Sequence, residues 1–162
     1  MQASNPDVFH RHVESNLKKI TTEPRNIKLL GETAGHLKIL GRLDESDALF
    51  AEVDSLLSKD QIKENLVNFL RWSDTKRYAG DFKSAREMLD DCEEMIRKNS
   101  PLASYEDFHL QHLGKLYFDL REYAKALECF EKALRLRLQK NQNDLIESTE
   151  FAIQQTKLRM NP

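Results

Sequence analysis

The chain has 162 residues, of which 40% are hydrophobic and 32% are charged, and its formal net charge is −2. This length and composition suit a single folded domain (residues 1–162) with many solvated charges. The charge balance lacks the positive excess that binding to a phosphate backbone requires, so we expect no nucleic-acid partner.

The N-terminal segment has no basic stretch followed by an apolar run, and no apolar stretch approaches membrane-spanning length. We therefore expect no membrane insertion and a cytoplasmic protein. The two cysteines, Cys92 and Cys129, both lie in apolar helical patterns. This placement predicts buried free thiols rather than a disulfide framework.

Helical periodicity runs along the chain, and the first helix is predicted at residues 7–20. Phe9, Val13 and Leu17 recur there at four-residue spacing and give one apolar stripe. Pro24 is expected to start the next helix, because proline is tolerated at the first helical position. Helix pairs are then predicted at 24–40 with 44–58, at 61–79 with 82–99 and at 103–120 with 122–140, followed by a closing helix at 144–160.

A short turn sequence recurs between the two helices of each pair. It consists of a turn residue, then an apolar or aromatic residue, then a small residue that opens the next helix. The three copies begin at Gly41, Gly80 and Arg121, which are 39 and 41 residues apart. Self-similarity at a period of this order indicates an array of helical repeats.

The third pair carries a characteristic set of residues: Leu110, Leu113, Gly114, Tyr117, Ala126, Phe130 and Ala133. In spacing and type this set resembles the signature of a tetratricopeptide repeat, in a variety with a period of about 40 residues. The resemblance covers roughly residues 27–140. It implies an all-α fold, a right-handed superhelical array of three hairpins (24–58, 61–99 and 103–140) between a leading helix (7–20) and a capping helix (144–160).

The resemblance also implies a binding groove, because the first helix of each pair lines the concave surface in this family. Basic residues outnumber acidic ones at the corresponding positions. Such a groove suits an acidic or apolar segment of another protein. The residues predicted to bind the partner are Lys28, Lys38, Arg71, Asp74, Arg77, Tyr78, Phe108, Gln111, His112 and Lys115.

Two glycines one turn apart, Gly31 and Gly35, lie inside a helical pattern, where glycine lowers helix stability. They do not form a phosphate-binding loop, since no strand precedes them and no Lys-Ser/Thr follows. We expect them to allow close contact with a neighbouring helix or a ligand. In chaperone-binding members of the family, residues at these two positions and at those of Phe108 and His112 help to clamp the C-terminal carboxylate of a partner. Most of the clamp residues are absent here, so a C-terminal carboxylate ligand is disfavoured.

No group of residues supports catalysis. His109 and His112 are three apart and could share a helix face as metal ligands, but no third ligand stands at a matching spacing. Neither cysteine has a CxxC partner or a histidine base beside it. We predict no catalytic residue, no metal and no cofactor. The late charges of the 122–140 helix, including Arg137 and Lys140, are interpreted as favourable to its dipole.

The sequence therefore predicts a non-enzymatic adaptor or regulator that binds a partner peptide or helix in a mildly basic groove. The alternative is a self-associating secretion-type chaperone or assembly subunit that forms a homodimer through the apolar stripe of its N-terminal helix.

Overall fold

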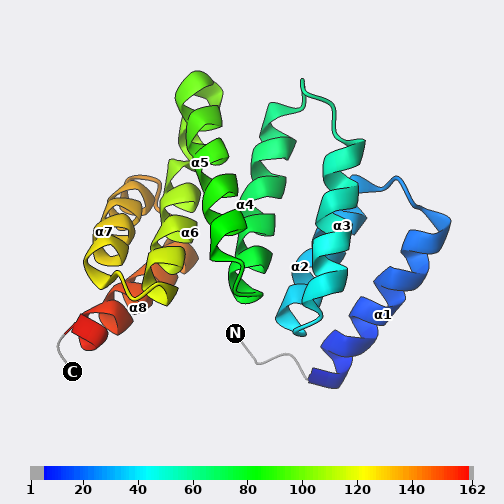
Figure 1. The fold of residues 1–162 in the computed structure, drawn as a ribbon, viewed down its shortest axis with the longest axis horizontal. Helices are drawn as coiled ribbons and strands as arrows, with labels where there is room; N and C mark the ends of the chain where they lie inside the picture. The colour runs from blue at the N-terminus through cyan, green and yellow to red at the C-terminus, as the bar shows by residue number, and fades with distance from the viewer. Residues whose placement is uncertain (1–5, 161–162) are drawn as a thin grey trace. The chain divides into compact units, whose positions relative to one another are not determined.

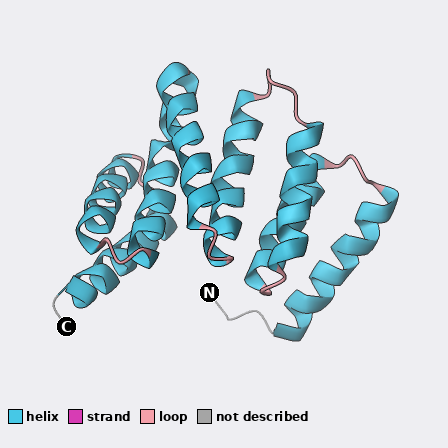
Figure 2. Cartoon of the chain, in the orientation of Figure 1, coloured by secondary structure: helices cyan, strands magenta, loops and turns pink. Residues whose placement is uncertain are grey.

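A computed structural model of the chain describes residues 6–160, and every regular element within that range is helical (Figures 1 and 2). The helices are α1 (Pro6–Thr22), α2 (Ile27–Ile39), α3 (Leu43–Leu56), α4 (Ile62–Tyr78), α5 (Phe82–Lys98), the 3₁₀ helix η1 (Ser100–Tyr105), α6 (Glu106–Asp119), α7 (Tyr123–Gln139) and α8 (Asn143–Met160). None of the described helices has the length and apolar character needed to cross a membrane. The predicted all-α fold class is confirmed.

The helices divide into two compact units, residues 1–79 with α1 to α4 and residues 80–162 with α5 to α8. In the first unit α2 and α3 form a hairpin, α4 packs against both, and α1 packs against α2. The core contains Leu30, Leu37, Phe50, Val53 and Leu66, each at most 3% exposed.

The small residue that opens α3 has a clear role in this unit. Ser46 is fully buried; its hydroxyl donates to the carbonyl of Ala34 on α2 at 2.8 Å and lies 3.0 Å from the hydroxyl of Thr75 on α4. A small side chain at this point therefore lets three helices meet, with its polar group satisfied.

The apolar stripe of the N-terminal helix is used within the first unit. Val13 is fully buried, and the ring of Phe9 meets the ring of His36 on α2 edge to face, with centroids 5.2 Å apart. An ion pair between Glu14 and Arg42 ties α1 to the turn after α2.

In the second unit α6 and α7 form a hairpin, with α5 against α6 and α8 against α7. Phe130 of α7 is 2% exposed and lies directly over Gly114 of α6: a Cβ atom at Gly114 would come within 2.6 Å of the ring. Both residues belong to the set that resembles the repeat signature, and in the structure they form a close contact between α6 and α7. Cys92 and Cys129 are buried and free, as predicted.

The recurring turns share one backbone device. Gly41 and Gly80 have φ values of 75° and 78°, and Arg121 adopts the same left-handed conformation with φ of 61°. After Gly41 the amide of Arg42 donates to the carbonyl of Leu37, and after Arg121 the amide of Glu122 donates to that of Tyr117. These bonds close the preceding helix in the pattern known as a Schellman motif.

Two helix starts differ from the sequence-based expectation. The second helix begins at Ile27 rather than Pro24, because the side chain of Asn26 accepts a hydrogen bond from the amide of Leu29 at 3.0 Å and caps the helix. The segment expected to begin a helix at residue 103 instead continues η1, and α6 begins at Glu106.

Candidate functional site

The predicted binding residues of the first unit all lie on α2 and α4, which contact each other. They form two groups. Lys28 and Arg71 line a cleft that includes the first turns of α2. The other group, near the ends of the two helices, consists of Lys38, Asp74, Arg77 and Tyr78.

The second group is organised around a buried carboxylate. Asp74 is 4% exposed, pairs with the ammonium of Lys38 and accepts hydrogen bonds from Nε and Nη2 of Arg77 at 3.0 and 2.9 Å. Buried charges are normally paired in this way. Two of the basic residues predicted to meet a ligand are therefore engaged with the protein itself.

Tyr78 is the exposed aromatic residue of this group, with 58% of its surface accessible. The ammonium of Lys38 lies 5.4 Å from the centroid of its ring, and the guanidinium of Arg77 lies 4.5 Å from the same centroid. These cation–π contacts hold the ring in place while leaving part of it open to solvent.

Arg71 lies across the two glycines of α2. A Cβ atom at Gly35 would come within 2.7 Å of Nη2 of Arg71, whereas one at Gly31 would lie 3.5 Å from Nη1. The guanidinium also sits over the ring of Phe50, 5.8 Å from its centroid. The expectation that the glycines allow a close contact is thus confirmed, and the contact is with the side chain of Arg71.

The cleft beside Arg71 has a volume of about 260 Å³ and lies between α2, α4 and the end of α3. Burial lowers the pKa of Arg71, opposed by the nearby charge of Glu32. Asn68 is 4% exposed; its amide nitrogen donates to the carbonyl of Phe50 at 3.2 Å. The residues around the cleft are Ile27, Lys28, Gly31, Glu32, Val53, Lys63, Glu64, Val67, Asn68 and Arg71.

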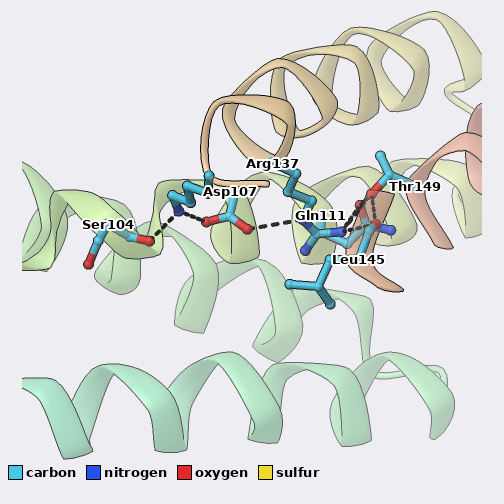
Figure 3. A network of polar contacts seen from close by, with 7 residues as sticks. Ser104, Asp107, Gln111, Arg137, Leu145 and Thr149 are labelled. Carbon is cyan, nitrogen blue, oxygen red and sulfur yellow. Dashed lines mark hydrogen bonds and ion pairs between the residues drawn. The ribbon is translucent and has the colours of Figure 1, made fainter. Parts of the chain in front are cut away.

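In the second unit, Gln111 belongs to a buried polar network (Figure 3). Its side-chain oxygen accepts from Nη1 of Arg137 and from the hydroxyl of Thr149, both at 3.1 Å, and its residue exposure is 5%. In this arrangement Gln111 joins α6 to α7 and α8 rather than facing solvent.

Arg137 is the centre of that network. It is 2% exposed and donates from Nε to Asp107 at 3.0 Å and from Nη1 to Thr149 at 2.6 Å. Lys140 is a second cation that pairs with Asp107, and it also donates to the carbonyl of Ser104. The interpretation of Arg137 as a charge that favours the helix dipole was incomplete, because its guanidinium is enclosed by α6, α7 and α8.

The remaining predicted residues lie on α6. Phe108 is half-buried, with the guanidinium of Arg137 5.5 Å from its ring centroid and the ring of Tyr105 at 6.1 Å. His112 and Lys115 are also half-buried, and each contacts other residues of the chain.

His109 is buried and acts as a structural donor. Its Nε2 donates to the carbonyl of Leu89 at 3.0 Å, and burial lowers its pKa. It borders a cleft of about 850 Å³ between α5 and α6, whose rim includes Asp90, Glu93 and Glu106. Within residues 6–160 no three histidine, cysteine or acidic side chains are grouped closely enough to hold a metal ion.

Two groups of residues were missed by the sequence analysis. Asn68 stands three residues before Arg71, so helical spacing alone could have placed both on one face of α4. Asp107 gave no such signal, since its partners Arg137 and Lys140 are about one hairpin away in sequence and only the packing of α7 on α6 brings them together.

Comparisons with known proteins agree with this geometry. Residues 110–137 match the model of the tetratricopeptide repeat, which confirms the resemblance stated for the third pair. No curated protein matches the chain. A solved structure described as the crystal structure of MamA has a TM-score of 0.56 and 15% sequence identity, covering 94% of this chain and 88% of that one. The chain therefore has an all-α fold like that of MamA and carries a tetratricopeptide repeat at residues 110–137.

Proposed function

We propose that the chain is a non-enzymatic adaptor or regulator that binds a segment of another protein along the face formed by α2 and α4. The helical-repeat fold is that of scaffolds for protein–protein interaction. The observation that carries the proposal is the cleft between these helices, where Arg71 is held in place beside open space. The proposed contact surface on the second unit is the part of α6 that presents Phe108, His112 and Lys115.

The chemistry of the α2–α4 face supports an acidic or apolar partner segment. Because Lys38 and Arg77 are engaged by the buried Asp74, the available basic character of this face comes mainly from Arg71 and from Lys28, whose side chain is 85% exposed and forms a 4.0 Å surface pair with Glu32. Tyr78 adds an exposed aromatic surface. Aromatic residues and arginine are the residue types that carry most binding energy in protein interfaces.

The self-association alternative has less support. The stripe on α1 that suggested it packs within the first unit, where Val13 is fully buried. Dimerisation through that stripe would require α1 to leave α2, with loss of the Phe9–His36 contact and of the Glu14–Arg42 ion pair.

The cytoplasm is the proposed setting of this interaction. Its support is the state of Cys92 and Cys129, which are both free and buried. Reduced thiols are the rule in the cytosol, where disulfides are rare.

The test is affinity capture from native cell extract, read by mass spectrometry, with three proteins compared. The first is the unmodified chain and the second carries Lys28→Glu, Lys63→Glu and Arg71→Gln on the α2–α4 face. The control, matched in its change of net charge, carries Lys83→Glu, Lys98→Glu and Lys132→Gln at three exposed lysines of α5 and α7. Circular dichroism confirms that all three proteins are folded.

We expect a partner that is retained by the unmodified chain and by the control but lost by the α2–α4 variant. A partner retained equally by all three would contradict binding at this face. If the α2–α4 variant and the control lose the partner together, general charge rather than this face governs capture.

A further inference from the structure

The guanidinium of Arg71 is held in a defined position, but no carboxylate within residues 6–160 pairs with its charge. The two glycines of α2 and the ring of Phe50 fix where its guanidinium lies. Within residues 6–160 it forms no ion pair and no hydrogen bond, and Glu32 acts on it only through longer-range attraction. A half-buried guanidinium without an acceptor is an unfavourable arrangement that a ligand can relieve.

A second polar group on the same face of α4 is also incomplete. The side-chain oxygen of Asn68 is buried and accepts no hydrogen bond from the described part of the chain, whereas the amide nitrogen of the same side chain donates to the Phe50 carbonyl. Asn68 and Arg71 are one helical turn apart and both line the cleft. The cleft thus offers fixed donors and an unsatisfied acceptor to the same occupant.

The rest of the cleft restricts what that occupant can be. Ile27, Val53 and Val67 supply apolar walls, which suit an aliphatic stem. The volume of about 260 Å³ lies below the usual range of small-molecule pockets, so it suits one side chain of a peptide with its adjoining backbone rather than a large ligand. Glu32 and Glu64 at the rim disfavour a doubly charged anion, whereas a single carboxylate matches the planar fork of one arginine.

We infer that this cleft is a subsite for one glutamate residue of the partner segment, with its carboxylate on Arg71 and a backbone N–H donating to Asn68. The inference rests on the proposed function, since it names the side chain of the partner that the α2–α4 face selects. Gly31 and Gly35 then serve recognition: they keep Arg71 against α2 and pointed at the cleft.

The experiment is an NMR titration of the full chain labelled with ¹⁵N, which follows the Arg71 Nε–H and the amides of Gly31 and Gly35. The probes are three capped amino acids: N-acetyl-glutamate N-methylamide, the glutamine equivalent and the phosphoserine equivalent. We expect saturable shifts with the glutamate probe at concentrations on the order of millimolar, as for a single-residue ligand. The glutamine probe, which has nearly the same shape without the charge, should give no saturable shift.

One variant at the cleft and one outside it form the comparison. Gly35→Ala places a methyl group within 2.7 Å of Nη2 of Arg71, so the guanidinium must shift and affinity for the glutamate probe should fall at least about tenfold. Ile39→Ala changes an exposed residue at the end of α2 that does not line the cleft, and it should retain affinity to within about threefold. Arg71→Gln is the second route to the same loss and does not depend on the fold tolerating Gly35→Ala.

Several results would overturn the inference. They are equal shifts with the glutamate and glutamine probes, no saturable shift with glutamate, unchanged affinity in the folded Gly35→Ala variant, or tighter binding of phosphoserine. Loss of partner capture by the α2–α4 variant together with a failed titration would leave the proposed function standing and remove the glutamate subsite. A successful titration with no captured partner would support the glutamate subsite and contradict the proposed function.

Discussion

Replacement of Arg137 by methionine tests whether the buried network of the second unit holds α8 in place. Arg137→Met keeps much of the side-chain volume but removes the donors to Asp107, Gln111, Thr149 and the carbonyl of Leu145. Asp107, which is fully buried, would retain Lys140 as its one cation among the described residues.

The expected cost follows from these contacts. Breaking a buried ion pair by removing one partner costs about 3–5 kcal/mol, because the other charge stays buried. Since Lys140 remains beside Asp107, we expect the lower end, about 3 kcal/mol in the free energy of unfolding. For a chain of this size that corresponds to a melting temperature lower by roughly 6–12 °C.

The assay is urea denaturation followed by two signals. Circular dichroism reports helix loss throughout the chain, whereas fluorescence comes from Trp72, which is the single tryptophan and lies in the first unit. Arg135→Met, an exposed position on the same helix, is the matched control and should change stability by less than about 0.5 kcal/mol.

A double-mutant cycle completes the test. If Arg137 and Asp107 act as a pair, Arg137→Met combined with Asp107→Asn should cost at least about 1 kcal/mol less than the two single changes added together. Additive costs, or an Arg137→Met variant as stable as Arg135→Met, would refute the argument from the buried network.

Three further predictions concern packing, a turn and pH. Gly114→Ala should lower the free energy of unfolding by about 1–3 kcal/mol in urea denaturation, because the added methyl group meets the buried ring of Phe130. Phe130→Ala should lower it by about 3–5 kcal/mol, and unchanged stability in either variant would contradict this packing. Arg121→Gly should raise the melting temperature, with a gain of about 1 kcal/mol, since it relieves a left-handed conformation at a non-glycine residue; a lower melting temperature would contradict this strain. Burial holds the pKa of His109 below its ordinary value, so the unfolded chain binds a proton there first as pH is lowered, and stability falls as pH drops below about 6.5. Between pH 8 and 5 the free energy of unfolding of His109→Gln should fall less steeply than that of the unmodified chain, and an identical slope would exclude this contribution.

The sequence was sufficient to predict features that depend on a single helix or a single hairpin. Glycine at positions 41 and 80 marked the turns correctly, and the spacing of Gly114 and Phe130 identified both as residues of one hairpin, where they meet. These features depend on residues that are adjacent on a helix or belong to one hairpin. Local propensity and apolar periodicity therefore determine them.

Charge pairing across helices could not be predicted in the same way. Lys38 and Asp74 are 36 residues apart, and Arg137 and Asp107 are 30 apart, so their partners depend on distances between helices. Helical spacing places each of these side chains on a face but does not say which opposite charge that face meets. For this reason Arg77 and Arg71, both predicted to bind a ligand, have different environments: one is paired with Asp74 and the other lies open to a cleft.

The buried thiols also determine how the protein reacts with electrophiles. Burial raises the pKa of Cys92 to about 12 and also raises that of Cys129, so almost none of either is present as the reactive thiolate at neutral pH. The folded chain should therefore be nearly inert to maleimides and mild oxidants. A single cysteine introduced at an exposed site such as Ile39 could then be labelled selectively while both native cysteines remain in place.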